Sequence, residues 1–191
     1  MIRNPELPAS PAQIRYLAKL TGNAPQSESM TMGEADKAIK AAMKDQGMAQ
    51  DNGKAKAIFQ EAYAAGNAAH EGCIPEPMVV QQHANMFDDN SPVVMQQVVN
   101  EGVCGHASIW LKCNTPRNTW FIKQLKREGL ASAGRDNFAC DGFTKDSYRG
   151  GFIYWVGTMT QSYERKRAFA HAFANVLKSH DITCYTFSDL D

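Results

Sequence analysis

Two residues in the middle of the chain, Cys104 and His106, have side chains that can carry out nucleophilic chemistry. They are two positions apart in a segment that alternates like a strand, so both side chains project from one face. A cysteine becomes nucleophilic when a nearby base takes its proton, and histidine is the usual base. Neighbouring strand positions rarely give the required geometry, and the sequence identifies no acid to orient the histidine. The pair is a candidate for catalysis, and a buried cysteine without a reaction is the expected alternative.

Cysteine and histidine also bind metals, and further residues of both types accompany this pair. The five cysteines have wide, irregular spacing, with no Cys-x-x-Cys pair and no two histidines four residues apart. Structural zinc sites normally contain such local pairs. We therefore expect no metal, no other cofactor, and reduced thiols rather than disulfides. A site built from distant residues stays open as a weaker alternative, drawn from Cys104, His106, Cys113, Cys140, His171 and Cys184.

Lysine and arginine are concentrated in one part of the chain. Residues 112–180 contain 12 of them against 5 Asp and Glu, whereas residues 55–111 contain 1 against 6. The net charge of zero therefore conceals a basic segment, which suits phosphate groups or an acidic protein surface. Solvated helix faces without a partner are the alternative. The candidate binding residues are Lys123, Lys126, Arg127, Arg135, Lys145, Arg149, Arg165, Lys166 and Arg167, together with Tyr148.

Aromatic residues on neighbouring strands form a further candidate surface. An aromatic sheet face that is open to solvent can stack unpaired bases. We expect instead that the strands at 78–99 or the helix at 55–71 cover this face and make it part of the core. Its members would be Trp110, also a candidate binding residue, with Tyr154 or Trp155 and Tyr185 or Phe187.

The elements that position these residues follow from periodicity and turn signals. From residue 103 the order is strand, helix, weak strand, strand, helix, strand. This is the ferredoxin-like split βαβ order, an antiparallel sheet with helices on one face. The strands are expected at 103–112, around 138–140, at 151–156 and at 182–187, and the helices at 115–128 and 161–179.

The residues before this unit predict a helical module at 1–47 and a linker at 48–54. Ser10 and Thr31 each open a capping-box sequence followed by apolar residues at helical spacing. A main domain then runs over 55–191, beginning with a helix at 55–71 whose small residues suggest close packing. Two extended segments that could pair as a hairpin follow at 78–82 and 93–99. The fold class is therefore α+β with an N-terminal helical module.

The composition indicates an ordinary globular protein. Hydrophobic residues make up 43% of the 191 residues, which suffices for a core. No apolar run is long enough to span a membrane, and the first residues lack the apolar stretch of a secretory signal. We expect a cytoplasmic protein without a membrane partner. Exposed strands and nine methionines would also suit a homo-oligomer.

Several short motifs follow one another along the second half of the chain. They are EGVCG at 101–105, YRGG at 148–151, QSYERK at 161–166, AHAFA at 170–174 and DLD at 189–191. On these motifs the chain resembles a group of uncharacterised proteins encoded by tailed bacteriophages and prophages. The resemblance spans residues 58–191 and implies a phage protein that acts in the host cytoplasm, without implying a reaction.

Three functions remain open at this point. The favoured one is a bacteriophage accessory protein that binds a host macromolecule without its own catalysis, for instance to inhibit a defence system in the manner of an anti-CRISPR protein. Segregated charge and the lack of a catalytic signature favour it. The first alternative is nucleic-acid binding by the basic surface of residues 112–180, and the second is a cysteine-dependent enzyme centred on Cys104 and His106. The expected partner is a host protein complex or nucleic acid.

Overall fold

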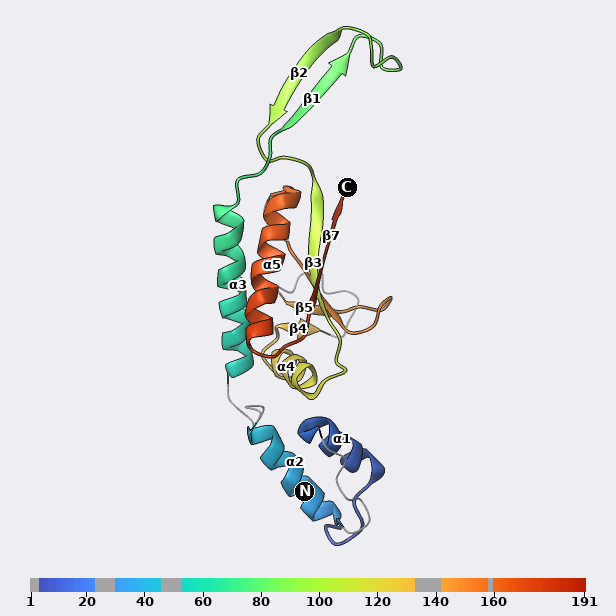
Figure 1. The fold of residues 1–191 in the computed structure, drawn as a ribbon, viewed down its shortest axis with the longest axis vertical. Coiled ribbons are helices and arrows are strands. Elements are labelled where there is room, and N and C mark those ends of the chain that lie inside the picture. Colours follow the sequence, from blue (N-terminus) through green and yellow to red (C-terminus); the bar gives the residue numbers. More distant parts are fainter. Residues whose placement is uncertain (1–3, 23–29, 46–52, 133–141, 158–159) are drawn as a thin grey trace.

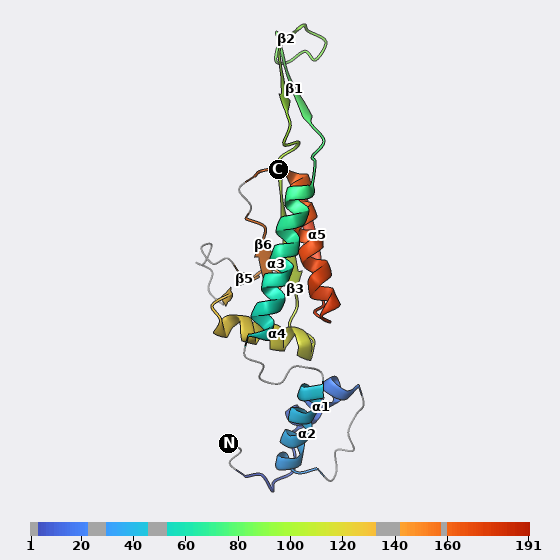
Figure 2. The ribbon, with the colours of Figure 1, turned by 90° about the vertical axis from the view of Figure 1, so that its left-hand side faces the viewer.

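The computed structural model describes residues 4–22, 30–45, 53–132, 142–157 and 160–191. These residues form an elongated molecule with three parts along its long axis (Figure 1). A helical module lies at one end, a layered α+β domain lies in the middle, and a two-stranded arm projects from the other end. A view turned by 90° shows the same succession (Figure 2).

Five helices and seven strands make up the described part of the chain. None of these helices is both long and apolar enough to cross a membrane. The helices are α1 (Pro11–Thr21), α2 (Met32–Asp45), α3 (Lys54–Gly72), α4 (Pro116–Arg127) and α5 (Tyr163–Ser179). The strands are β1 (Met78–His83), β2 (Val93–Val99), β3 (Gly105–Leu111), β4 (Ala131–Ser132), β5 (Phe143–Lys145), β6 (Phe152–Trp155) and β7 (Tyr185–Leu190).

Each of the two helices of the N-terminal module begins with the capping box that the sequence predicted. The Ser10 hydroxyl accepts a hydrogen bond from the Gln13 backbone at 3.2 Å, and the Gln13 side chain accepts one from the Ser10 backbone at 3.0 Å. Thr31 and Glu34 make the same reciprocal pair at the start of α2. Leu20 of α1 belongs to the hydrophobic core of the main domain, so the module packs against that domain. Most of the linker expected at 48–54 lies outside the described residues.

The central sheet has the strand order β4-β5-β6-β3-β7. Its four main strands, β5, β6, β3 and β7, pair in antiparallel fashion in the ferredoxin-like order that the sequence predicted. The two-residue strand β4 pairs in parallel with β5, which makes the sheet mixed rather than purely antiparallel. The weak strand expected around 138–140 lies outside the described residues, and β5 takes the second position of the split βαβ unit.

The three helices α3, α4 and α5 cover one face of this sheet (Figures 1 and 2). Their contact with the sheet is a cluster of buried aromatic rings. Tyr154 of β6 stacks on Phe173 of α5 with ring centroids 5.2 Å apart. Phe59 of α3 packs edge-on against Phe143 of β5 at 6.2 Å and against Tyr154 at 5.9 Å. Because one cluster contains rings from the sheet and from both helices, α3 is fixed beside α5 on this face.

The close packing that the small residues of α3 suggested is found at Gly66. A Cβ atom at this position would lie 2.8 Å from the ring of Phe169 on α5, a ring that is itself buried. Gly72, at the end of the same helix, has nothing within 4 Å of such an atom. The two helices therefore approach each other as closely as a glycine allows.

The last strand begins later than the sequence indicated. Its pairing with β3 starts at Tyr185, not at Ile182. Asp181 has a positive φ of 60°, and the Ile182 backbone donates to the carbonyl of Leu177 at the end of α5. The Thr183 backbone donates to the side-chain oxygen of Asn118 at 3.0 Å, so residues 181–184 connect α5 to the sheet rather than extend it. The predicted bounds of 182–187 were wrong for this reason.

The approach of α3 to α5 gives the first prediction. Alanine is normally a better helix residue than glycine by about 1 kcal/mol. At position 66 its methyl group would overlap the Phe169 ring, and overpacking of a core costs ~1–3 kcal/mol. We therefore expect Gly66→Ala to lower the free energy of unfolding relative to Gly72→Ala, measured by chemical denaturation. Equal or higher stability of Gly66→Ala would show that the two helices lie further apart.

Candidate functional site: the open face of the sheet

No described helix covers the second face of the sheet, and only the loop between β5 and β6 lies against part of it. Alternation along β3 directs Ala107, Ile109 and Leu111 toward the helices, where all three are fully buried. The side chains of His106 and Trp110 point the other way and are half-buried. The expectation that this face is core was wrong. The α3 helix packs on the opposite face, and β1 and β2 project beyond the end of the sheet (Figure 1).

The strand register collects aromatic side chains on this open face. Ser108 of β3 lies opposite Trp155 of β6 on one side and opposite Phe187 of β7 on the other. In the next row, Trp110 lies opposite Tyr185. The side chain of Trp155 is 49% exposed and that of Tyr185 is 54% exposed. The small, buried Ser108 thus lies between two large rings.

These rings also contact one another, which fixes their positions. The centroids of Trp110 and Tyr185 are 5.8 Å apart, and those of His106 and Trp155 are 5.7 Å apart. Of the alternatives that the sequence left, Trp155 belongs to the open face, whereas Tyr154 faces the helices. Tyr185 and Phe187 both lie on the open face. Side chains held in this way lose little conformational freedom when a flat ligand stacks on them.

The loop between β5 and β6 places a cation on the same face. The Asp146 carboxylate accepts hydrogen bonds from the backbones of Tyr148, at 2.8 Å, and Arg149, at 3.1 Å. The Trp110 indole donates to the Gly150 carbonyl at 2.7 Å, which ties the loop to β3. The Arg149 guanidinium then lies over the ring of Phe187 at 4.2 Å.

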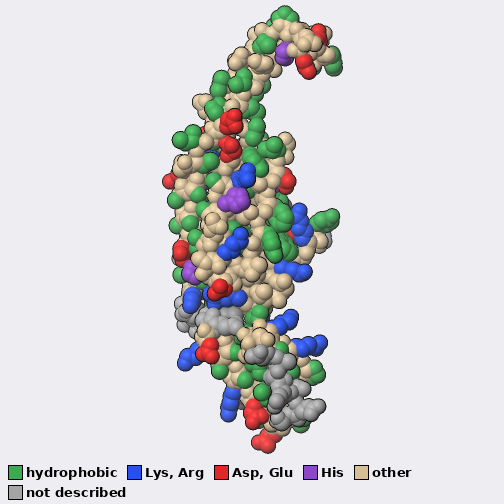
Figure 3. Space-filling model, in the orientation of Figure 1, with side chains coloured by type: hydrophobic (Ala, Val, Ile, Leu, Met, Phe, Trp, Pro, Cys, Tyr) green, Lys and Arg blue, Asp and Glu red, His purple; other side chains and the backbone are tan. Residues whose placement is uncertain are grey.

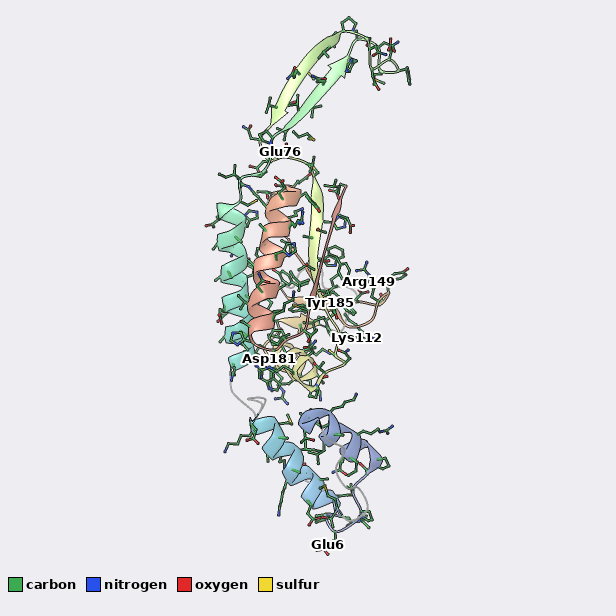
Figure 4. The ribbon with its side chains drawn as sticks, in the orientation of Figure 1. Glu6, Glu76, Lys112, Arg149, Asp181 and Tyr185 are labelled. Atoms are coloured by element: carbon green, nitrogen blue, oxygen red, sulfur yellow. The ribbon has the colours of Figure 1, made fainter. Side chains whose placement is uncertain are left out.

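The open face is electrically polarised along β3. Lys112, directly after β3, joins Arg149 and Tyr185 at the lower end of the sheet (Figure 4). At the upper end, His106 lies 3.7 Å from a carboxylate oxygen of Asp189 and 3.2 Å from one of Asp191. One end therefore suits anionic groups, and the other repels them.

The remaining basic candidates are divided between two ends of the domain. Lys126 of α4 lies over the Phe152 ring at 4.7 Å. On α5, Arg165 is 3.6 Å from the Glu101 carboxylate and Lys166 donates to the Gly105 carbonyl at 2.8 Å. These α5 residues lie at the upper end of the helix, whereas α4 crosses the lower end of the domain (Figure 1).

The other basic candidates are exposed or lie outside the described residues. Lys123 and Arg127 are exposed on α4, Arg167 is exposed on α5, and Lys145 is exposed on β5. Arg135 lies outside the described residues.

The thiol of Cys104 interacts with Gln161 and not with His106, the base that catalysis would need. Its Sγ donates to the Gln161 side-chain oxygen at 3.5 Å, and its backbone bridges to Ser162. His106 has carboxylate neighbours at Asp189 and Asp191 that the sequence did not reveal. These carboxylates can orient the imidazole, but the thiol interacts with Gln161 instead. The geometry therefore gives no support to a Cys–His nucleophile.

The candidate metal ligands are likewise dispersed. Cys184 is buried in the main core, Cys113 is exposed after β3, and His171 is exposed on α5. Within the described ranges no group of three or more His, Cys, Asp or Glu side chains has the arrangement of a metal site. Cys140 lies outside these ranges.

The environments of the cysteines predict an order of reactivity. Burial raises the pKa of the Cys184 thiol to about 11. At pH 8 only roughly one in a thousand thiols with this pKa is ionised. Since thiolate is the form that reacts, Cys184 should react very slowly. We expect iodoacetamide to label exposed Cys104 in the native protein and to label Cys184 only after unfolding, as read by peptide mass spectrometry. Rapid native labelling of Cys184 would contradict the packing between α5 and β7.

One residue of the open face could have been found from the sequence, because Lys112 continues the alternation of His106 and Trp110. The pairing of Asp189 with His106 depends on the register between β3 and β7, which the sequence does not give.

Comparison with protein-family models, with curated proteins and with solved structures gave no match. The function of this chain is therefore inferred from its own surfaces.

Proposed function

We propose that this chain is a non-catalytic binding protein of bacteriophage origin whose open sheet face holds an unpaired strand of host nucleic acid. The observation that carries the proposal is the group of aromatic rings on the open face, with Trp155 and Tyr185 exposed, beside the cations Arg149 and Lys112. Bases of a single strand present flat π-faces that stack on aromatic side chains, whatever their sequence. Cations beside the rings neutralise the phosphates that join those bases.

The geometry of the face indicates where a strand would lie. Trp155 and Tyr185 expose about half of their side chains and provide the main stacking surfaces. Neighbouring strands of a sheet are about 4.8 Å apart, and Trp155 lies one row above Tyr185, so their positions on the sheet are roughly 12 Å apart. A nucleic-acid strand that runs obliquely from Trp155 across β3 to Tyr185 would meet both rings and reach the two cations at the lower end. The carboxylates of Asp189 and Asp191 keep the phosphates away from the upper end.

This placement predicts which substitutions weaken binding. Stacking of one base contributes about 1–3 kcal/mol, so Trp155→Ala and Tyr185→Ala should each raise the Kd by roughly 5- to 150-fold. The measurement is fluorescence anisotropy of a labelled single-stranded oligonucleotide, with DNA and RNA compared. About two phosphate contacts would give a slope near −1.4 for log K against log salt concentration.

Matched variants separate this face from the basic helices. Arg149→Ala should weaken binding, whereas Arg127→Ala, an exposed arginine on α4, should leave it unchanged. Cys104→Ser should also bind as the wild type, because no step of the proposal uses the thiol. A lack of saturable binding at low salt would overturn the proposal. A larger loss in Arg127→Ala than in Arg149→Ala would move the site to the helices.

A second candidate is a host protein complex, for example one that belongs to a defence system. The same observation supports it in part, because Trp, Tyr and Arg are the residues that dominate protein-binding hot spots. Affinity capture from host lysate, with and without nuclease, separates the two functions. Recovery that collapses with nuclease supports the nucleic-acid proposal. One host complex that is retained after nuclease and lost in Tyr185→Ala would favour the protein partner.

A further inference from the structure

The two-stranded arm is a second surface without a described partner. We use this name for β1, β2 and the residues 84–92 that join them. The two strands pair in antiparallel fashion with one register shift, between Gln82 and His83. The neighbouring residues Val79 and Val80 point to opposite faces of the ribbon and both are exposed. Figure 3 shows apolar side chains on one of these faces. An isolated hairpin is at best marginally stable in water, and bare edge strands favour association. The exposed apolar residues of its strands are Val79, Val80, Val93, Val94, Met95 and Val98.

The tip of the arm combines exposed apolar side chains with negative charge. The side chains of Met86 and Phe87 are 80% and 94% exposed. Asp88 accepts a hydrogen bond from the Asn90 backbone at 3.0 Å and so shapes the turn, while Asp89 is exposed beside it. Residues 73–103 contain no lysine or arginine. A complementary surface would be apolar or aromatic along the arm and positively charged where the tip ends.

The open sheet face of a second copy has this pattern. Its aromatic rings are exposed along the sheet, and its two cations, Lys112 and Arg149, lie at the lower end. The arm begins at the upper end of the α+β domain, next to the start of β3 (Figure 1). The six residues of β1 and the seven of β3 each extend about 20 Å at the rise of a strand. An arm laid from the upper end would therefore bring Phe87 and Asp89 to these cations.

We infer that a second copy of this chain supplies the occupant, and that two chains exchange arms around a two-fold axis. Each arm lies on the open face of the other chain, with the acidic tip beside Lys112 and Arg149 of that chain. A two-fold arrangement forms every contact twice, which turns a modest surface into a stable interface. This inference does not depend on the nucleic-acid proposal. If both hold, the arm and the strand compete for one face.

A charge exchange tests this arrangement. Asp89→Lys and Lys112→Glu each place like charges together, and each should raise the dimer dissociation constant by about 10-fold or more. The double variant Asp89→Lys/Lys112→Glu restores opposite charges and should recover much of the dimer. Phe87→Ser should weaken the dimer as well, whereas Leu7→Ser, an exposed apolar residue of the distant N-terminal module, should not. Sedimentation velocity over a range of full-length protein concentrations measures the dissociation constants of the wild type and of all five variants.

Three outcomes would overturn the inference. One is a wild-type protein that stays monomeric up to about 100 μM. Another is a double variant no more dimeric than the single ones. The third is a photoreactive group at position 87 that cross-links to the arm of the other chain rather than to its open face, since the arms would then pair with each other. Oligonucleotide binding below the dimer dissociation constant tests the nucleic-acid proposal separately, so one can fail without the other.

Discussion

The structure depends on how β3 divides its side chains between the two faces of the sheet. It is hydrogen-bonded to β6 on one side and β7 on the other, so both its faces are fixed by the register of three strands. The face with Ala107, Ile109 and Leu111 is apolar and packs against α5, and α3 lies beside α5. The aromatic cluster of Phe59, Phe143, Tyr154 and Phe173 then joins these helices to the sheet. Because the three described helices of the domain all pack on this side, none of them covers the other side of β3.

The elements and their order were largely predictable from the sequence. Capping residues such as Ser10 and Thr115 mark helix starts by satisfying backbone donors locally, and the structure shows both in that role. The split βαβ order followed from short-range periodicity. The side on which α3 packs did not follow, because an amphipathic stripe shows that a helix buries one face but not which sheet surface it meets. The prediction of a covered aromatic face failed at this step.

The open face was visible in the sequence only in part. Trp110 and the alternative pairs at 154–155 and 185–187 were identified, but the choice within each pair depends on register. The position of Arg149 depends on the turn at Asp146 and on the hydrogen bond from Trp110 to Gly150. This hydrogen bond joins residues 40 positions apart, so the sequence does not reveal it. Whether the α4 and α5 cations share a surface also depends on the helix arrangement, which periodicity does not supply, and the structure places them at different ends of the domain. Cys104 and His106 illustrate the same limit, since the contacts with Gln161, Asp189 and Asp191 are all long-range.

The two occupants proposed for the open face have related physical properties. A single strand presents flat rings and phosphates, whereas the arm presents Phe87, valine side chains and the carboxylate of Asp89. Both combine an apolar surface with negative charge, and both suit rings beside Lys112 and Arg149. Rings already held by their neighbours lose little freedom on binding either one. The polarity of the face then orients the ligand, because the carboxylates beside His106 exclude an anionic group from the upper end. An arm that enters from that end with its only charges at the tip satisfies this constraint over the whole length of β3.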